Sequence, residues 1–436
     1  MSKELKRREF LGIGSAVAAG LLVGCNMQEQ RRLELPAWRD QAPDGTPLKA
    51  GLIGCGGRGT GAAINFLNAG KELSVIALGD VFQDRLDECR KKLLEEKSNE
   101  VSSEKCFVGF DAYEKVIDAG VDVIILATPP HFRPEHFSAA VNARKHVFME
   151  KPVAVDPPGA RSIIASSKKA EAIGLCVGTG TQRRHQRDYV ETFKQIYEGA
   201  IGKIVAANCY WNQSQLWYVK PQKGWSEMEM MIRDWVNWTW LSGDHIVEQH
   251  VHNIDVINWF SGSHPVKAVA FGARHRRITG DQYDMFSVDF EYEDGRHVHS
   301  MCRQINDCAN NVSEYLRGTE GYTNAQNTIF NTDGSVKWTY SYPPDEQGKP
   351  ADRISISPYD QEHIDLVTAI RTNKPYVEGE TTAISTLAAI MGRISAYTGK
   401  AVTWEEVMNS DLRLGPDTYS LGDVAIKTEI PIPGTA

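Results

Sequence analysis

A glycine-rich loop near the start of the chain has the residue types and spacing that hold a dinucleotide pyrophosphate. The loop follows an apolar run at 48–53 and precedes a helical pattern, and it reads Gly54, Cys55, Gly56, Gly57, Arg58, Gly59. In a GxGxxG loop the first glycine permits the turn, the second lets the backbone approach the phosphates, and the third lets helix and strand pack closely. Free N–H groups at the helix start bind phosphate oxygens. We therefore expect cofactor contacts from Gly54, Gly56, Gly57, Arg58 and Gly59.

An acidic residue stands where such a loop needs one. The next apolar run, 73–78, is followed closely by Asp80. A carboxylate at the end of this strand accepts hydrogen bonds from the adenosine ribose hydroxyls and would repel a 2′-phosphate. Because two apolar residues follow it rather than an arginine, the sequence favours NAD over NADP. Arg58 and Arg85 lie close enough in the sequence to keep NADP as the alternative.

Further apolar runs supply the strands that must position these groups. Runs at 121–127, 146–149 and about 174–178 alternate with helical patterns, and the second of them ends at Glu150 and Lys151. This alternation predicts a doubly wound parallel sheet. Ligands bind at the carboxyl ends of such strands, so the residues that follow each run are expected near the cofactor.

With Glu150, Lys151 and Pro152 directly after a strand, the chain resembles the Gfo/Idh/MocA oxidoreductases. Later segments at 200–204, 255–262 and 393–399 also resemble motifs of that family, so the resemblance extends over most of the chain. It implies a Rossmann domain followed by an α/β domain with an open, mostly antiparallel sheet. It also implies an NAD cofactor across one end of that sheet, a sugar-like substrate between the domains, and a homo-oligomer.

We divide the chain into four parts on these grounds. Residues 1–25 form a signal, 26–47 a tether, 48–178 the NAD-binding Rossmann domain, and 179–436 the substrate-binding α/β domain. Helices within 359–400 are expected to pack back on the Rossmann domain.

The resemblance assigns a catalytic role to Lys151. An ammonium at this position can hydrogen-bond a hydroxyl that is being oxidised and take part in proton transfer. The chain departs from the family pattern at Pro130 and Arg133, where Asn and His are usual. The other cofactor contacts expected in this region are Thr128, Pro129, His131 and Glu150.

A second group of chemically active residues begins at Glu248. The family pattern here is Asp-x-x-x-His-x-x-Asp, and Glu248, His252 and Asp255 match it, with Glu replacing the first Asp. A spacing of four places Glu248 and His252 on one helical face. A neutral imidazole can accept a hydroxyl proton near pH 7. We expect His252 to act as the base, Glu248 to tune its pKa or hold sugar hydroxyls, and Asp255 to contact substrate.

The same residues raise a metal site as an alternative. Glu248, His250 and His252 form a legitimate ligand set for zinc. On a regular helix, however, residues two apart point about 200° away from each other and do not share an ion. An irregular turn would remove that objection. We expect no metal.

Aromatic residues are concentrated where a sugar would bind. Seven of the ten tryptophans fall between Trp211 and Trp259. Indole faces stack on the C–H faces of sugars, although core packing explains most such residues. The additional substrate contacts that we expect are Arg183, Tyr210, Trp211 and Trp238, with Trp217 also worth testing.

The N-terminus resembles an export signal. Arg7 and Arg8 precede Phe-Leu, as in twin-arginine signals, and a short apolar segment ends at a lipoprotein-like box with Cys25. This predicts a periplasmic or outer-surface lipoprotein that meets the membrane only through its lipid. In that compartment Cys302 and Cys308 would form a disulfide or remain thiols.

Charge and compartment narrow the function. The net charge is −8, with no basic cluster in the body of the chain, which argues against nucleic acid. An exported enzyme has no free NAD pool, so we expect a tightly held cofactor that is regenerated in each cycle. The leading hypothesis is an oxidoreductase acting on a sugar hydroxyl. The alternatives are an NAD-recycling glycoside hydrolase and a non-catalytic sugar-binding lipoprotein.

Overall fold

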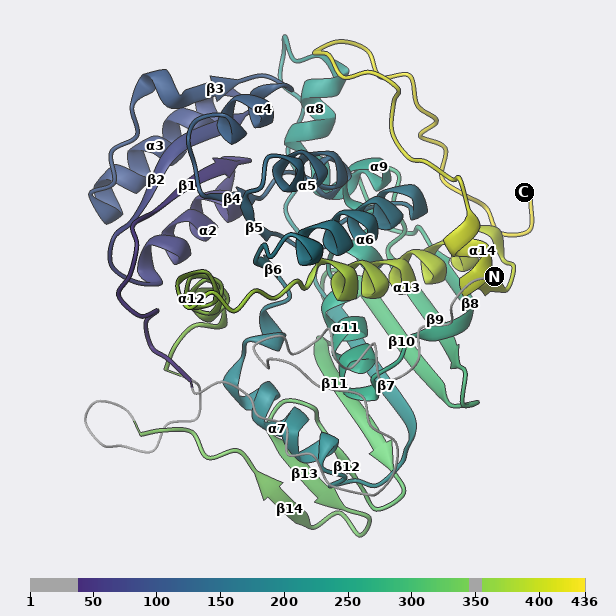
Figure 1. Cartoon of the computed structure of the whole chain (residues 1–436). Coiled ribbons are helices and arrows are strands. Elements are labelled where there is room, and N and C mark those ends of the chain that lie inside the picture. The colour runs from purple at the N-terminus through teal and green to yellow at the C-terminus, as the bar shows by residue number, and fades with distance from the viewer. Residues whose placement is uncertain (1–37, 345–354, 436) are drawn as a thin grey trace.

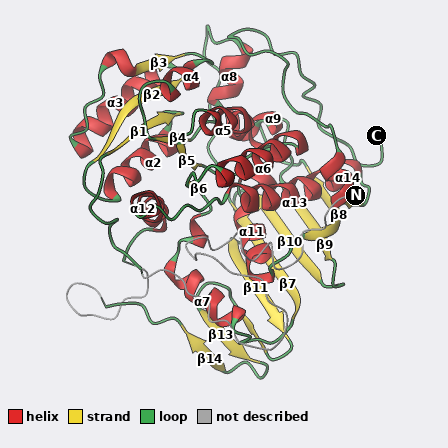
Figure 2. Cartoon of the chain, in the orientation of Figure 1, coloured by secondary structure: helices red, strands yellow, loops and turns green. Residues whose placement is uncertain are grey.

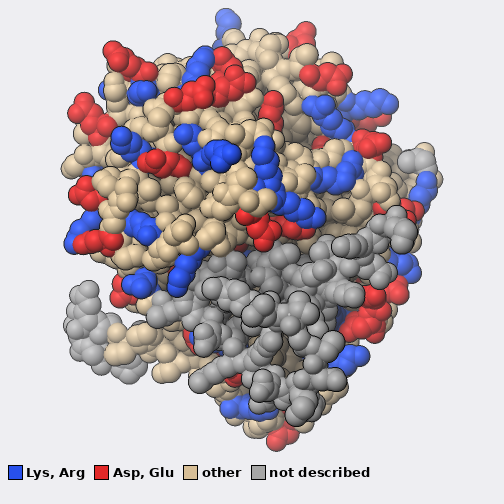
Figure 3. All heavy atoms as spheres, in the orientation of Figure 1, with Lys and Arg blue, Asp and Glu red and all other residues tan. Residues whose placement is uncertain are grey.

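The computed structural model describes residues 38–344 and 355–435. The predicted signal, 1–25, and the first part of the predicted tether lie outside the described residues. Within them, no helix is long and apolar enough to cross a membrane. Acidic and basic side chains are interspersed over the face of the molecule shown in Figure 3.

The first domain is built on a six-stranded parallel sheet in the order β3-β2-β1-β4-β5-β6. Its strands are β1 (Leu48–Ile53), β2 (Leu73–Asp80), β3 (Cys106–Val108), β4 (Val123–Leu126), β5 (His146–Met149) and β6 (Val177–Thr179). All four residues of β4 are buried, as expected for a strand that is covered on both faces. The helices between these strands are α2 (Gly57–Asn68), α3 (Gln83–Lys97), α4 (Ala112–Ile117), α5 (Arg133–Asn142) and α6 (Pro157–Ala172). The predicted doubly wound fold is confirmed.

The second domain contains a nine-stranded sheet in the order β14-β13-β12-β11-β7-β10-β9-β8-β15. Only the central pair, β7 and β10, runs parallel, so the sheet is mostly antiparallel as predicted. Its strands are β7 (Ile204–Gln213), β8 (Pro265–Ala273), β9 (Met285–Tyr292), β10 (His297–Gln304), β11 (Asn311–Gly318), β12 (Gly321–Thr323), β13 (Thr328–Asn331), β14 (Val336–Thr339) and β15 (Val402–Thr403). Helices lie against one face of this sheet (Figures 1 and 2).

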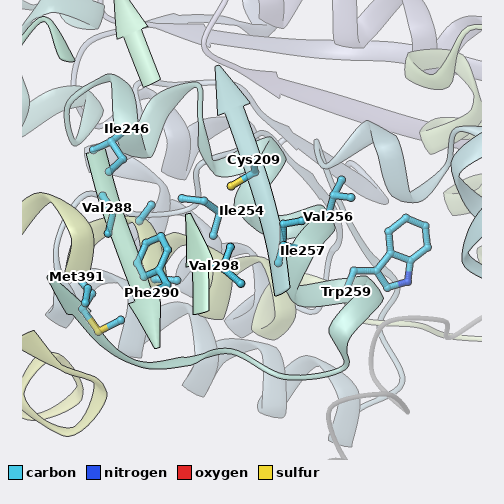
Figure 4. Close-up of a cluster of buried hydrophobic side chains, with 14 of the residues drawn as sticks. Cys209, Ile246, Ile254, Val256, Ile257, Trp259, Val288, Phe290, Val298 and Met391 are labelled. Carbon is cyan, nitrogen blue, oxygen red and sulfur yellow. The ribbon is translucent and has the colours of Figure 1, made fainter. Parts of the chain in front are cut away.

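The helices that follow β6 are α7 (Arg187–Tyr197), α8 (Glu227–Arg233), α9 (Thr239–Ser242), α10 (His245–Glu248), α11 (Val251–Ser261), α12 (Pro358–Arg371), α13 (Gly379–Thr398) and α14 (Trp404–Asn409). Of these, α10, α11 and α13 contact the strands of the second sheet or pack beside the helices that do. Figure 4 shows the core between them and the sheet, where Ile246, Ile254 and Met391 face Val288 and Phe290. The packing fixes α10 and α11 against the strands.

The two helices expected to return to the first domain lie in different places. Ile364, Leu366 and Val367 of α12 belong to the apolar cluster of the first domain, and Asp360 accepts a 2.7 Å hydrogen bond from Asn65 of α2. α13 packs between α6 and the second sheet. Through α12 and α13, the C-terminal part of the chain therefore packs against both domains.

The end of the predicted tether is docked on the body. Trp38 Nε1 donates a 3.0 Å hydrogen bond to Glu191 of α7. Arg371 of α12 donates a 2.8 Å hydrogen bond to the carbonyl oxygen of Pro43. Residues 38–47 are thus part of the folded structure, because their polar groups find partners on both domains.

The glycine loop shows why two of its positions need glycine. Gly54 has φ of 95°, in the left-handed region. A Cβ on Gly59 would lie 1.8 Å from the carbonyl oxygen of Gly54, so α2 packs on β1 only with glycine there. By contrast, a Cβ on Gly56 or Gly57 would meet no atom within 4 Å. These two glycines leave the loop backbone open on the side where phosphates bind.

We predict that Gly59→Ala lowers the free energy of unfolding by about 1–3 kcal/mol, because the added methyl group overpacks the contact between helix and strand. Gly57→Ala is the matched control and leaves that free energy unchanged, since its Cβ meets open space. Urea denaturation followed by circular dichroism measures both. Equal stabilities for the two variants would contradict the packing argument.

Candidate active site and cofactor pocket

A cavity of about 410 Å³ lies at the carboxyl ends of β1, β2 and β4. The predicted cofactor residues that line it are Gly54, Gly56, Gly57, Arg58, Gly59, Asp80, Thr128 and Pro129. The start of α2 points its free N–H groups at this place. A dinucleotide fits the residues present, because the open glycine backbone can meet phosphates and Asp80 can accept from a ribose.

Asp80 also builds the loop that it faces. Its two carboxylate oxygens accept hydrogen bonds from the backbone N–H groups of Cys55 (2.6 Å) and Phe82 (2.9 Å). Burial raises the pKa of Asp80, and these two hydrogen bonds oppose the rise. The carboxylate therefore fixes the shape of the glycine loop while its position at the cavity suits recognition of a ribose.

Glu150 acts on the loop rather than lining the cavity. Its carboxylate accepts a 2.5 Å hydrogen bond from Arg58 Nε. The Arg58 guanidinium also lies 4.9 Å from the ring centre of Tyr359 on α12. Glu150 lies beside the glycine loop as the ion-pair partner of Arg58, and its direct contact with the cofactor stays a prediction. This pairing also occupies a cation that a 2′-phosphate would need, which favours NAD.

Lys151 and Glu248 meet across the two domains. Lys151 Nζ donates to the carbonyl oxygen of Glu248 (2.8 Å) and to its carboxylate (3.1 Å). Both side chains are nearly buried, with exposed fractions of 12% and 6%. The other carboxylate oxygen accepts a 2.5 Å hydrogen bond from Gln249. β5 and α10 thereby place an ammonium and a carboxylate at one point between the domains.

His252 lies beside this ion pair on the first turn of α11. Its ring stacks on the indole of Trp211, with ring centres 5.6 Å apart. Burial lowers the pKa of His252 well below its usual value, and the positive charges of Lys151 and Arg183 lower it further. The imidazole is therefore held neutral, which is the state that a base requires.

The helix break between α10 and α11 bears on the metal alternative. This break is an irregular turn of the kind that could let His250 and His252 bind the same metal ion. His250 instead bonds Ser300 Oγ at 2.7 Å inside the sheet, while His252 stacks on Trp211. Among the residues that the structure describes, no group of three or more His, Cys, Asp and Glu side chains has the arrangement of a metal site.

Arg183 also lies beside the site, but it is already paired. It donates a 2.5 Å hydrogen bond to buried Glu314 and lies over the ring of Trp211, 5.5 Å from its centre. Glu314 also accepts from Tyr189 (2.9 Å) and Asn253 (2.6 Å). The sequence analysis missed Glu314 because a single acid within a strand gives no local signal. Asn253 was detectable only as the neighbour of His252.

Asp255 lies in a structural ion pair. Its two carboxylate oxygens accept hydrogen bonds from Arg184 at 2.8 and 2.9 Å, and Ser385 donates a third at 2.8 Å. The side chain is buried, so its acceptors are used by the protein. The expected substrate contact finds no support here, since Asp255 joins α11 to α13 and to the segment before α7.

Tyr210 and Trp238 also lie elsewhere than expected. Strand alternation turns Trp211 toward the helices and Tyr210 toward the opposite face of the sheet, where its ring contacts His299. Trp238 packs against an apolar cluster that contains Met228 and Trp240. Of the aromatic candidates, Trp211 lies at His252, whereas Trp217 lines the cofactor cavity.

His131 contacts the segment after α14 (residues 410–435), which we call the C-terminal segment. Its Nε2 lies 2.7 Å from the hydroxyl oxygen of Tyr419, and its ring packs edge-on against Trp240. Burial lowers its pKa to about 3. His131 therefore helps to hold the chain's C-terminal segment, and its cofactor contact stays a prediction.

The cysteines are free thiols throughout the described part of the chain. Cys302 is buried in the second sheet, whereas Cys308 is exposed. The disulfide considered between them is not formed in this structure.

Family models match both domains in order. Residues 48–179 match the oxidoreductase family with an NAD-binding Rossmann fold, and residues 189–324 match the GFO/IDH/MocA C-terminal domain. Together the two matches span more than half of the chain.

Curated relatives match less than half of the chain. The myo-inositol 2-dehydrogenase of Thermotoga maritima is 31% identical over 156 residues, which is 36% of this chain and 42% of that protein. The 2,7-anhydro-N-acetylneuraminate hydratase of Escherichia coli is 25% identical over 179 residues, 40% of this chain and 44% of that protein. The chain spans less than half the length of these two relatives.

Solved structures share the whole fold. The scyllo-inositol dehydrogenase of Lactobacillus casei, with NAD(H) and scyllo-inositol bound, has a TM-score of 0.60 at 20% identity, covering 82% of this chain and 99% of that one. The aldose-aldose oxidoreductase of Caulobacter crescentus has a TM-score of 0.63 at 18% identity, covering 82% and 100%. With both of its domains matched by the family models, this chain belongs to the Gfo/Idh/MocA family of NAD-binding oxidoreductases.

Proposed function

We propose that this protein is an NAD-dependent oxidoreductase that transfers hydride from a hydroxyl-bearing carbon of a sugar or sugar derivative. The observation that carries the proposal is the meeting of Lys151, Glu248 and a neutral His252 between the two domains. The dinucleotide cavity lies on the first domain at neighbouring strand ends. Lys151, Glu248 and His252 do not line that cavity; Lys151 follows β5, which pairs with β4, and the cavity residues Thr128 and Pro129 follow β4.

The residues divide the proton chemistry between them. The Lys151 ammonium donates a hydrogen bond to the substrate oxygen and stabilises the negative charge that develops there. Neutral His252 accepts the hydroxyl proton as hydride leaves the carbon. Glu248 orients the Lys151 ammonium through its 3.1 Å contact. NAD, when bound, supplies the hydride acceptor.

A neutral, hydroxyl-rich substrate suits the charges at this site. The two cations that act on His252, Lys151 and Arg183, each already hold a carboxylate. The indole of Trp211 offers an apolar face beside the base. Inositol dehydrogenases are among the relatives of this chain, and inositols are such substrates.

Export and cofactor recycling belong to the same proposal. The N-terminal sequence, outside the described residues, supports transport by the twin-arginine route and lipid attachment at Cys25. Outside the cytoplasm a net dehydrogenase would stop after one turnover, so NAD is held tightly and regenerated within each cycle. The homo-oligomer expected from the family stays a prediction.

An NAD-recycling glycoside hydrolase is the second candidate. In that reaction, oxidation of a ring hydroxyl acidifies the neighbouring carbon, the leaving group is eliminated, water adds, and the hydride returns. A relative named as a hydratase favours this candidate, because it indicates that the family includes reactions without net redox change. A non-catalytic sugar-binding protein would have no need for a neutral base beside a buried ammonium.

We predict that His252 stays neutral to well below pH 6.5, the ordinary value for its pKa. The fold disfavours the imidazolium, so protons bind more readily to the unfolded chain, and acid below that pH favours unfolding. NMR titration of ring-labelled histidine measures the pKa. Lys151→Met raises it by removing a nearby positive charge, while Lys97→Met, on the exposed end of α3, does not. A midpoint at or above 6.5 in the unaltered protein would contradict the lowering of the pKa by burial and by the neighbouring positive charges.

We predict that the protein, folded in the cytoplasm without residues 1–25, retains NAD and turns over many times without accumulating NADH. Mass spectrometry of the denatured protein identifies the nucleotide, and absorbance follows its redox state while sugars and glycosides are added. Lys151→Met lowers turnover by about 10²–10⁴-fold, and Lys97→Met does not. Accumulation of NADH in step with product would instead make it a net dehydrogenase. Release of sugar from glycosides would select the hydrolase.

We predict that Cys25→Ser abolishes lipid attachment while leaving the folded body unchanged, because the thiol is the acylation point. Labelling of expressing bacteria with a fatty-acid analogue, followed by membrane fractionation, measures this. Equal labelling of both proteins would exclude Cys25 as the anchor.

A further inference from the structure

The cofactor cavity has walls from both domains. The first domain contributes Asp80, Phe82 and Phe110 beside the glycine loop. The second domain contributes Trp217, Val219, Ile232, Arg233 and Trp235. We call residues 217–235 the cover segment. Because the acid at the end of β2 marks the adenosine end of a Rossmann site, the cover segment lies over the adenosine half.

Arg233 attaches the cover segment to the first domain. Its guanidinium donates two hydrogen bonds to Asp84, at 2.9 and 3.0 Å, and a third to Glu229 at 2.9 Å. The same group lies 3.9 Å from the ring centre of Phe82 and 4.9 Å from that of Trp225. Asp84 and Phe82 follow the ribose-side acid Asp80 in the sequence. The attachment therefore sits at the mouth of the adenosine site.

The C-terminal segment forms hydrogen bonds with the cover segment. The N–H of Met228 donates a 3.0 Å hydrogen bond to the carbonyl oxygen of Gly422, and the N–H of Val424 donates a 2.7 Å hydrogen bond to Glu227. Tyr419 of the same segment bonds His131 of the first domain. Figure 1 shows this yellow segment passing beside α8. The cover is thus tied to the first domain twice.

We propose that the cover segment, latched by Arg233 on Asp84, retains the dinucleotide through many catalytic cycles. The inference rests on the proposed use of NAD at this cavity. For the adenosine half to leave, the paired contacts of Arg233 must break and the apolar cluster of Phe82, Met231 and Ile232 must separate. Trp217, which the sequence raised as a sugar-binding candidate, and Trp235 form walls of the nucleotide site.

The test measures exchange of the nucleotide, independently of activity. The purified protein, with its bound NAD, is mixed with excess isotope-labelled NAD. Mass spectrometry then measures over time how much of the bound NAD carries the label. Arg233→Ala and Asp84→Asn each accelerate exchange at least about tenfold, equivalent to about 1.4 kcal/mol. Nucleotide exchange in the double variant is no faster than in the faster of the two single variants, because each single substitution already breaks the same contact. Arg317→Ala, exposed on β11, keeps the original rate.

A milder change guards against misfolding. Tyr419→Phe removes only the hydroxyl that meets His131 and is expected to give a smaller acceleration. Exchange at the unaltered rate in the Arg233 and Asp84 variants would overturn the latch while leaving the proposed NAD chemistry intact. An unaltered protein that neither retains nor binds NAD would overturn the proposed function, and the latch with it.

Discussion

The contact of Lys151 with Glu248 determines much of the surrounding structure. It joins the end of β5 in the first domain to α10 in the second, where both groups are nearly buried. Breaking such a pair by removing one partner costs about 3–5 kcal/mol, because the remaining charge is left without compensation. The contact thus fixes the relative positions of the strand and the helix. Burial lowers the pKa of the nearby His252, and the positive charge of Lys151 lowers it further. The ion pair therefore fixes the geometry of the site and contributes to its protonation state.

Other ion pairs near the site each lie within one domain. Arg58 with Glu150, Arg183 with Glu314, and Arg184 with Asp255 each join segments far apart in the sequence. Every one of these cations is neutralised before a ligand arrives. The surroundings of the site are consequently nearly neutral, which favours recognition through hydroxyl groups and an aromatic face over recognition of a charged substrate.

Local sequence patterns were sufficient to predict the fold of the first domain and part of the site. The strand, the glycine loop, the helix and the acidic residue of a Rossmann unit follow one another within about thirty residues. The sequence alone therefore predicts the roles of the residues from Gly54 to Asp80. Glu314 and Arg233 depend on partners more than a hundred residues away, and no local pattern marks them. The ion pair of Asp255 with Arg184 was not predicted, because a motif position gives a residue's register but not its partner. For Tyr210, strand alternation reveals its face only after the neighbouring strands are known.

Retention of the cofactor would limit the chemistry that this fold can perform. If NAD cannot exchange, the hydride taken from one carbon must return to a carbon that binds in the same cleft. Net reactions are then redox-neutral within the cleft: transfer between two sugars, epimerisation, or elimination followed by hydration. A single neutral base, His252, and a single ammonium, Lys151, serve both directions, because the acid and the base of the forward step reverse roles in the return step. A latched cover over the adenosine half makes such a closed cycle compatible with a compartment that lacks free NAD.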